Sequence, residues 1–237
     1  MKTVDLANWT PRPLPSEGPL VGSRVLVSAT EVDRDANGLY EATREGDPAL
    51  WNYLSYGPFE DAAAFRAFLE RHVADPEVKP MTVIDRASGV PLGSASYLRI
   101  VPQDGVIEIG HIFFGAALQR TAAATEAIYL MIRHAFDDLG YRRVEWKCDA
   151  ANARSVRAAT RFGFTPEGVF RQHRIVRGRN RDTAWFSIID REWPPLRAAF
   201  EDWLAEDNFD AEGRQIRRLE ECRAARGAGS EVRPAAS

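Results

Sequence analysis

The sequence predicts an α/β fold of the α+β kind, in which helices flank a mixed, mostly antiparallel central sheet with one parallel strand pair. Two observations predict it. Residues 80–114 alternate apolar and polar side chains in three runs separated by turn residues, which is typical of an antiparallel meander. Residues 121–139 then carry apolar side chains at helical spacing, and 142–149 alternates again. Strand, helix and strand therefore form a crossover whose two strands run parallel.

Further elements surround this centre. The meander strands are expected at 80–85, 91–101 and 106–114, and they are preceded by a strand and two helices at 24–28, 33–45 and 59–73. The crossover is followed by a short helix, a β-hairpin and a last helix at 153–161, 169–176 with 183–189, and 194–204. These elements predict one domain at 22–206. An extended Pro- and Gly-rich arm, 1–21, precedes it, and a charged helix with a disordered tail, 207–237, follows it.

The composition of the chain narrows the classes of function. Of its 237 residues 45% are apolar, which is enough for a core that needs neither a metal nor disulfides, and we predict no metal site. The net charge of -3 argues against nucleic acid as a partner. Cys148 and Cys222 lie in unlike surroundings and are not expected to pair. No apolar leader begins the chain, and no stretch approaches the roughly 18 apolar residues of a membrane span. We therefore expect a cytoplasmic protein without a membrane partner.

The segment between the third meander strand and the long helix is the first candidate for a binding site. It has the sequence GAALQRTAAAT, so a helix begins directly after a short loop. Free backbone N–H groups and the positive end of the helix dipole suit a phosphate there. Small side chains at 122–124 would let a ligand approach the backbone, and Arg120 would add a charged contact. The alternative is that an Ala-rich segment simply begins a helix well and that Arg120 is solvated.

Three segments together resemble the GNAT acetyltransferase superfamily, and more narrowly its RimJ/RimL branch of ribosomal-protein N-terminal acetyltransferases. GHIFFGAALQRTAAATEA is similar to the acetyl-CoA loop of the superfamily. KCDAANARSVRAATRFGF resembles the branch's run of Cys, Asn, Ser and Gly-Phe and is the most specific segment; the matching residues are Cys148, Asn152, Ser155, Gly163 and Phe164. EGVFRQHRIVRGRNRDTAWFSIID is similar to the branch's final hairpin. The resemblance spans roughly residues 22 to 204.

The resemblance implies an N-acetyltransferase that moves an acetyl group from acetyl-CoA (coenzyme A) to a primary amine by direct attack. The acetyl-CoA would lie between the strands at 106–114 and 142–149. Its pantetheine would run along the backbone of Ile112, Phe113 and Phe114. Its pyrophosphate would lie on Gln119, Arg120, Thr121, Ala122, Ala123, Ala124 and Thr125, and Asn152 and Ser155 would also contact the cofactor. Ala122 stands where the pattern has glycine. If this position needs a left-handed backbone, alanine would be strained there; if it needs only a small side chain, alanine is sufficient.

Direct attack needs one group that accepts the proton of the amine and another that donates a proton to the leaving thiolate. Ser155 matches the position of the branch's proton donor, and its alternative is a plain first-turn serine. Asn152 would bind pantetheine, cap the helix, or do both. Glu108 is the best candidate base, because burial in an apolar strand would make it a better proton acceptor; its alternative is a solvated glutamate on the exposed strand face. Asp149 and His111 are the other candidates, with a satisfied core histidine as the alternative for His111.

The acceptor pocket would be shaped by the helices at 33–73 and by the last hairpin. Its candidate lining residues are Trp51, Tyr53, Tyr56, Trp146 and Cys148. For each of the aromatic residues an ordinary core position is the alternative, and Cys148 is expected to line the site rather than to act as a nucleophile. The hairpin also carries five arginines, Arg171, Arg174, Arg177, Arg179 and Arg181. These would suit an acidic protein, RNA or a second subunit, but a solvated outer face is the favoured interpretation because the chain is slightly acidic.

Competing functions follow from these patterns. The first is an active N-acetyltransferase, and the second is a catalytically weak acyl-CoA-binding or regulatory module, which the missing loop glycine makes conceivable. A nucleic-acid-binding protein is disfavoured by the negative charge. A dinucleotide-binding Rossmann domain is excluded because the chain has no G-x-G-x-x-G motif. The sequence leaves the acceptor open between a small molecule and a protein N-terminus, and it is compatible with a homodimer.

Overall fold

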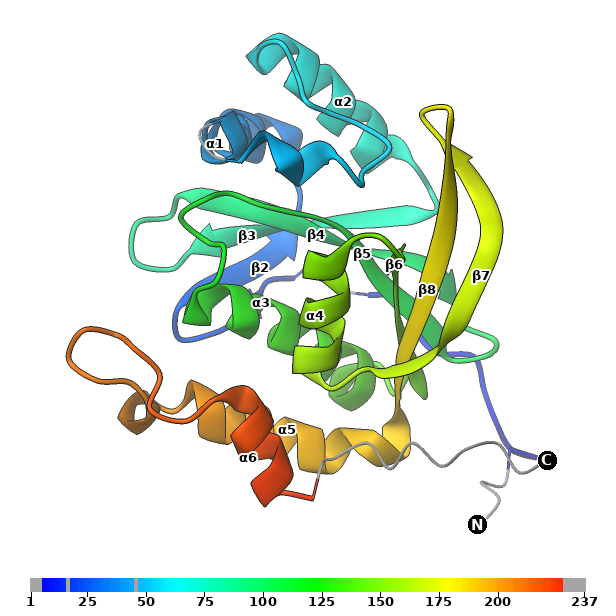
Figure 1. Cartoon of the computed structure of the whole chain (residues 1–237), viewed down its shortest axis with the longest axis vertical. Helices are drawn as coiled ribbons and strands as arrows, with labels where there is room; N and C mark the ends of the chain where they lie inside the picture. Colours follow the sequence, from blue (N-terminus) through cyan, green and yellow to red (C-terminus); the bar gives the residue numbers. More distant parts are fainter. Residues whose placement is uncertain (1–5, 16–17, 45–46, 228–237) are drawn as a thin grey trace.

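The computed structural model describes residues 6–15, 18–44 and 47–227, and one central sheet organises them (Figure 1). Eight strands lie in the order β1-β2-β3-β4-β5-β6-β8-β7. Neighbouring strands are antiparallel, except that β5 and β6 are parallel. The predicted mixed, mostly antiparallel sheet with one parallel pair is therefore confirmed.

The bounds of the elements are as follows. The strands are β1 (Leu20–Val21), β2 (Val25–Ala29), β3 (Val78–Asp85), β4 (Pro91–Val101), β5 (Val106–Phe114), β6 (Arg143–Asp149), β7 (Thr165–Val176) and β8 (Arg179–Ile189). The α-helices are α1 (Val32–Arg44), α2 (Ala62–Ala74), α3 (Ala122–Arg133), α4 (Ala153–Phe162), α5 (Trp193–Leu204) and α6 (Leu219–Ala225). A short 3-10 turn, η1 (Pro48–Trp51), lies between α1 and α2.

Helices cover both faces of the sheet (Figure 1). α1 and α2 lie on one face, where Trp51, Phe65 and Phe68 form a core with Phe113 of β5. α3, α4 and α5 lie on the other face, where Ile107 and Ile109 of β5 belong to the larger core. We call these the α1–α2 face and the α3–α4 face. Successive side chains of a strand alternate between them, so each central strand contributes to both.

The long helix expected at 121–139 is divided. α3 ends at Arg133, and His134–Asp138 continues as a π-helical turn. The Tyr97 hydroxyl donates to the Met131 carbonyl at 2.7 Å, immediately before the hydrogen-bond ladder changes. A side chain that inserts into this ladder is a recognised cause of such a break. The apolar spacing continues through the π-helical turn, so sequence periodicity could not indicate the division.

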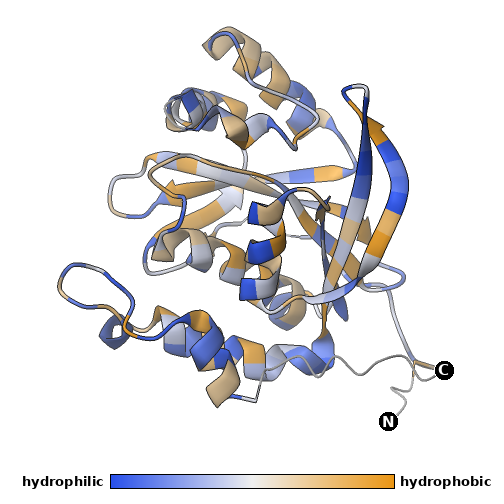
Figure 2. Cartoon of the chain, viewed as in Figure 1, coloured by the Kyte–Doolittle hydropathy of each residue, from blue (hydrophilic) through white to orange (hydrophobic). Residues whose placement is uncertain are grey.

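The last hairpin is longer than the sequence predicted. β7 begins at Thr165 rather than 169, and β8 begins at Arg179 rather than 183. Its turn is only Arg177-Gly178, whose φ angles of 51° and 71° are those a tight hairpin turn requires. Figure 2 shows mostly hydrophilic residues on β8 towards this turn. Arg177 donates to the Gly57 carbonyl, so the tip of the hairpin lies against the segment after η1.

The segments on either side of 22–206 also contact the sheet and helices where the structure describes them. In the N-terminal arm, Trp9 Nε1 donates to the carbonyl of Gln103, between β4 and β5, at 2.6 Å. Beyond α5, Leu219 and Cys222 of α6 are fully buried. Cys148 is buried as well, and both cysteines are free. The part of the tail at 228–237 lies outside the described residues. Within the described part of the chain, no helix is long and apolar enough to cross a membrane.

Candidate active site

The parallel strands β5 and β6 pair over only three residues and then separate. The last pair is Glu108 with Glu145, although β5 continues to Phe114 beside β4 and β6 continues to Asp149 beside β8. A bulge explains why β5 turns away. The register between β4 and β5 shifts after Ser94, and His111 has a φ of 50°, as bulged strands bend locally. A slot between two strand edges follows, at the carboxyl ends of both strands.

The start of α3 offers three backbone donors without a partner. Thr121 caps the helix, and its side chain accepts from the N–H of Ala124 at 3.1 Å while its carbonyl accepts from Thr125. Among the described residues, the N–H groups of Arg120, Ala122 and Ala123 find no acceptor. Only these three N–H groups of the expected binding segment 119–125 are therefore available to a ligand. The other four already donate within the protein; they belong to Gln119, Thr121, Ala124 and Thr125.

Arg120, rather than Ala122, has the left-handed backbone conformation in this loop. Arg120 has a φ of 61°, whereas Ala122 is the first helical residue. The strain considered for alanine at 122 is therefore absent, and the small side chain keeps the helix start open. Gln119 closes the loop from the other side, because its side chain donates to the Phe114 carbonyl at 2.7 Å.

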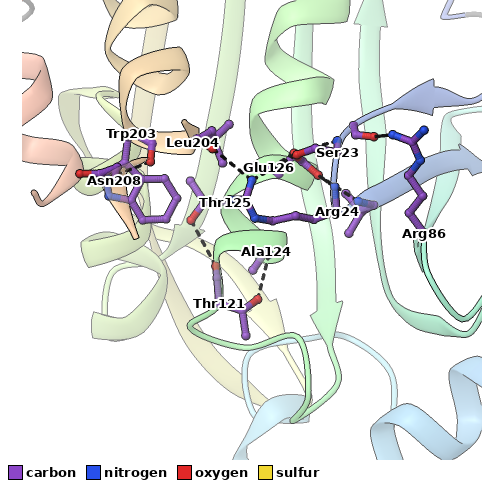
Figure 3. A network of polar contacts seen from close by, with 12 residues as sticks. Ser23, Arg24, Arg86, Thr121, Ala124, Thr125, Glu126, Trp203, Leu204 and Asn208 are labelled. Carbon is purple, nitrogen blue, oxygen red and sulfur yellow. Dashed lines mark hydrogen bonds and ion pairs between the residues drawn. The ribbon is translucent and has the colours of Figure 1, made fainter. Parts of the chain in front are cut away.

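Glu126 and Arg161 fix this helix start against the rest of the fold, and Figure 3 shows the contacts of Glu126. Glu126 is buried and accepts from the N–H groups of Arg24 at 2.7 Å and Val25 at 2.9 Å, at the beginning of β2. Gly22 permits this approach, since a Cβ there would lie 2.5 Å from a Glu126 oxygen. From α4, Arg161 donates to the Thr125 hydroxyl at 2.9 Å, and burial lowers the pKa of this guanidinium. The sequence did not indicate Arg161, a cation that contacts the first turn of α3.

Ser155 lies in the first turn of α4, near the α3–α4 face of β6. Asn152 caps this helix, and its side chain accepts from the Ser155 N–H at 3.2 Å. The Ser155 hydroxyl accepts from Trp146 Nε1 at 2.9 Å. Burial raises the pKa of the Cys148 thiol, and a hydrogen bond with Ser155 opposes this only in part. Cys148 is therefore held as a thiol and does not suit a nucleophile.

Glu108 lies in an ion-pair cluster on the α1–α2 face. Its side chain is buried, with 3% of the residue exposed, so the solvated alternative is wrong. Its Oε2 atom accepts from Arg99 at 2.6 Å and lies 2.9 Å from Lys147 Nζ. Lys147 also contacts Glu145 at 2.5 Å and lies 4.0 Å from the centre of the Trp185 ring. Sequence analysis missed Arg99, Lys147 and Trp185, whose contacts depend on the register between strands.

His111 and Tyr56 lie together on the same face. The rings of His111 and His72 are 5.1 Å apart, and Tyr56 lies edge-on to His111 at 5.8 Å. Burial lowers the pKa of His111 to about 4, and the nearby charges of His72 and Arg99 add to this. Its Nδ1 atom is buried and has no partner among the described residues. One ring nitrogen of His111 is therefore not satisfied by the described protein groups.

The five candidate pocket residues do not converge. Trp51 and Tyr56 lie on the α1–α2 face, 5.6 and 6.3 Å from the Phe113 ring. Tyr53 is 39% exposed, and its hydroxyl donates to the Ala151 carbonyl. Trp146 packs on the opposite face against Phe162 and Phe164, and Cys148 belongs to the same core. Successive side chains of a strand point to opposite faces of the sheet, so Trp146 and Cys148 lie on the face opposite to Lys147.

Asp149 ends β6 and has a local role. Its side chain accepts from the N–H of Ala151 at 2.9 Å and so shapes the turn into α4. Two surface hollows of about 400 and 440 Å³ lie elsewhere, beside Trp9 and beside Glu126. None of the predicted site residues lines either hollow.

These residues fit a coenzyme A thioester. The slot between β5 and β6 exposes strand edges to which an extended chain with amide groups could bond. The unpartnered amides at the start of α3 suit phosphates, and the small side chains of Ala122 and Ala123 leave room for them. Ser155 lies beside β6, where its hydroxyl accepts from Trp146 Nε1.

Comparisons with known proteins agree with this arrangement. Residues 24–165 match the family model described as an acetyltransferase (GNAT) domain. A GCN5-related N-acetyltransferase from Brucella melitensis has a similar crystal structure, with 43% identity, a TM-score of 0.89, and coverage of 92% of this chain and 100% of that one. An uncharacterized N-acetyltransferase, p20 of Bacillus licheniformis, is 25% identical over 62% of this chain and 84% of its own. YdaF of Bacillus subtilis, provisionally named a ribosomal N-acetyltransferase, is 30% identical over 36% of this chain and 46% of its own.

The matched family model covers more than half of the chain, and it includes the slot between β5 and β6, the start of α3 and the first turns of α4. GNAT acetyltransferases use acetyl-CoA as the acetyl donor. The chain belongs to the GNAT acetyltransferase family and is an acetyltransferase.

Proposed function

We propose that this protein acetylates a primary amine by direct attack on acetyl-CoA in a ternary complex, in the manner of the RimJ/RimL branch. The observation that carries the proposal is the separation of β5 from β6 after Glu108, together with the three unpartnered amides of Arg120, Ala122 and Ala123 in the loop that Gln119 joins to the end of β5. An extended thioester and a phosphate group find partners within one continuous site.

Different residues of the chain would bind different parts of acetyl-CoA. When bound, acetyl-CoA supplies the acetyl thioester. The edge of β5 from Ile112 to Phe114 would bond pantetheine, and the amides of Arg120, Ala122 and Ala123 would bind the pyrophosphate. The side chain of Arg120 would add positive charge from the loop, and that of Arg161 donates to the Thr125 hydroxyl in the first turn of α3.

Ser155 is the proposed proton donor to the leaving thiolate. Because its oxygen already accepts from Trp146 Nε1, its own proton is directed away from that ring. Asn152 holds the Ser155 backbone through the helix cap and would also contact pantetheine. Both roles of Asn152 are compatible with one side-chain position.

Glu108 is the proposed base. Two cations fix its Oε2 atom, and Oε1 has no hydrogen-bond partner among the described residues. The carboxylate is therefore held in place while Oε1 stays free to accept a hydrogen bond. This suits a group that accepts a proton directly or through one water molecule. His111 is the second candidate, since its buried Nδ1 is also without a partner, but a pKa of about 4 makes it a weak proton acceptor near neutrality.

The acceptor is a small amine or a protein N-terminus. The branch assignment rests on Cys148, Asn152 and Ser155, together with the provisional name of the relative YdaF. A cytoplasmic location and a homodimer stay predictions from the sequence.

The experiment that tests this function is a calorimetric titration with acetyl-CoA and desulfo-CoA. We expect micromolar binding that Ala123→Glu weakens at least tenfold, because a carboxylate would occupy the three amides. Ala117→Glu is the matched control, since Ala117 is exposed in the same loop. Equal binding by both variants, or no binding at millimolar cofactor, would contradict the proposed site. Binding without acetylation of any amine would support the weak acyl-CoA-binding module instead.

A further inference from the structure

Two arginines of the last hairpin face each other across the strand pair. Arg174 of β7 and Arg181 of β8 are directly opposite in the strand register. Like charges opposite each other on an antiparallel pair destabilise it. Among the residues that the structure describes, neither guanidinium forms an ion pair or donates a hydrogen bond, and the Nε atom of Arg181 is buried without a partner. Asp149 and Glu108 attract Arg181 without forming an ion pair with it, so an anion between the two arginines would stabilise the arrangement further.

The hairpin arginines differ in exposure. Arg177 donates to the Gly57 carbonyl, and Arg171, Arg174 and Arg179 are exposed. Arg181 is half-buried, and burial lowers the pKa of its guanidinium; Arg174 acts in the same direction, whereas Asp149 and Glu108 oppose it. A buried charge is expensive without a partner. The interpretation of the hairpin as a solvated face therefore holds for its outer arginines and fails for Arg181.

The arginine pair lies beside the proposed acceptor side of the site. Thr183 of β8 pairs with Asp149, the last residue of β6, so Arg181 extends just beyond the end of that strand. Alternation places Arg181 on the same face as Thr183 and Trp185, and the Trp185 ring lies against Lys147 of the Glu108 cluster. The charge of Arg174 also contributes to the lowered pKa of His111. Arg174 therefore acts on His111, and Arg181 is attracted by Glu108, two groups of the α1–α2 face.

Further donors on this face also lack partners. Trp185 Nε1 and His111 Nδ1 are buried and, within the described part of the chain, unpartnered like Arg181 Nε. Buried polar atoms are nearly always hydrogen-bonded in folded proteins, so such a group of exceptions points to a missing polar ligand.

We propose that Arg174 and Arg181 bind an anionic group, a carboxylate or a phosphate, that the acceptor amine itself carries. This rests on the proposed function, because it names the acceptor class of the same site. A guanidinium pair binds either anion through charge-assisted hydrogen bonds. The bound anion would remove the repulsion between the arginines and hold the amine near the end of β6. Neutral amines would lack this contact.

Paired acceptors test the proposal through turnover. We would measure kcat/KM for β-alanine against β-alaninamide and for phosphoethanolamine against ethanolamine. The wild-type protein should prefer the anionic member of at least one pair by tenfold or more, and the pair that shows the preference identifies carboxylate or phosphate. Arg181→Gln should reduce the preference to about twofold or less. Arg179→Gln, an exposed arginine of the same strand, should leave it unchanged. Equal use of charged and neutral acceptors by the wild-type protein would overturn the proposal.

A binding measurement makes the test independent of turnover. Inorganic phosphate and acetate would be titrated by calorimetry into protein saturated with desulfo-CoA, so that neither enters the cofactor site. Arg181→Gln and Arg174→Gln should each weaken binding of one anion at least tenfold, whereas Arg179→Gln should not. Failure to bind desulfo-CoA would overturn the proposed function. Normal desulfo-CoA binding with no anion binding, or with equal loss in all three variants, would overturn only the anion site. Thermal unfolding of each variant checks that it is folded.

Discussion

The two faces of the central sheet are built in different ways. On the α3–α4 face, the groups proposed to bind acetyl-CoA are positioned by neighbours in the sequence: Thr121 caps α3, Asn152 caps α4, and Gln119 bonds the end of β5. On the α1–α2 face, Glu108 is positioned by Arg99 and Lys147 from two other strands. Local contacts thus form the cofactor side, whereas pairing between strands forms the acceptor side.

This difference has a consequence for stability. Caps are worth about 1 kcal/mol each and can be lost singly. The ions around Glu108 are buried together, so removing one leaves the others uncompensated. Substitutions on the acceptor side should therefore be more destabilising than substitutions of the caps.

The largest effect is expected for Lys147→Met. This change removes the cation that lies between Glu108 and Glu145, both of them buried, and it should lower the free energy of unfolding by about 3 kcal/mol. Urea denaturation measures it. Lys79→Met is the control, because among the described residues Lys79 donates to the Pro15 carbonyl alone, and its loss should cost much less. Equal losses would mean that the cluster does not act as a unit.

Ser155→Ala should lower kcat by about 100-fold, because the proton donor is lost. The Kd for acetyl-CoA, measured by calorimetry, should change by less than about threefold, since no phosphate contact is removed. Ser88→Ala, in an exposed turn, is the matched control. An unchanged kcat would refute the role given to Ser155.

The stability should depend on pH through His111. Its folded pKa is about 4, below the unfolded value of about 6.5, so the unfolded chain binds more protons between these values. Stability should therefore fall as the pH drops, by about 2 kcal/mol between pH 7.5 and 5. His72, Arg99 and Arg174 favour the neutral ring, and Asp75 opposes them.

His111→Asn should remove this part of the pH dependence, and asparagine tolerates the positive φ at this position. His173→Asn, on the exposed hairpin, should not change it. Denaturation at several pH values compares the three proteins. The same slope in His111→Asn as in the wild type would show that another group causes the loss.

The smallest effect is expected for Thr121→Ala. Loss of the cap should cost about 1 kcal/mol of unfolding free energy, because the Ala124 N–H loses its acceptor. Thr121→Ser should retain most of it. Acetyl-CoA binding should weaken only slightly if the phosphate uses the three neighbouring amides. A loss as large as that of Lys147→Met would contradict the distinction between the two faces.

Much of the fold could be predicted from the sequence. Alternation and helical spacing located the meander, the crossover and the parallel pair, since each pattern reports which face of a single element is buried. Gly163 also follows from local rules: its φ of 93° ends α4 as a left-handed cap, and Phe164 then packs on Trp146. Part of the run that resembles the RimJ/RimL branch is therefore explained by helix termination.

The amino-acid sequence by itself determined the order of elements, the loop before α3 and the caps, because these depend on residues within one or two turns of each other. Tertiary structure alone decided that Trp146 lies away from Trp51, that Arg120 rather than Ala122 has the left-handed backbone, and that Arg174 faces Arg181. The physical reason is strand register. A shift of one residue moves every side chain of a strand to the other face, and no local pattern fixes which residues of two distant strands become partners.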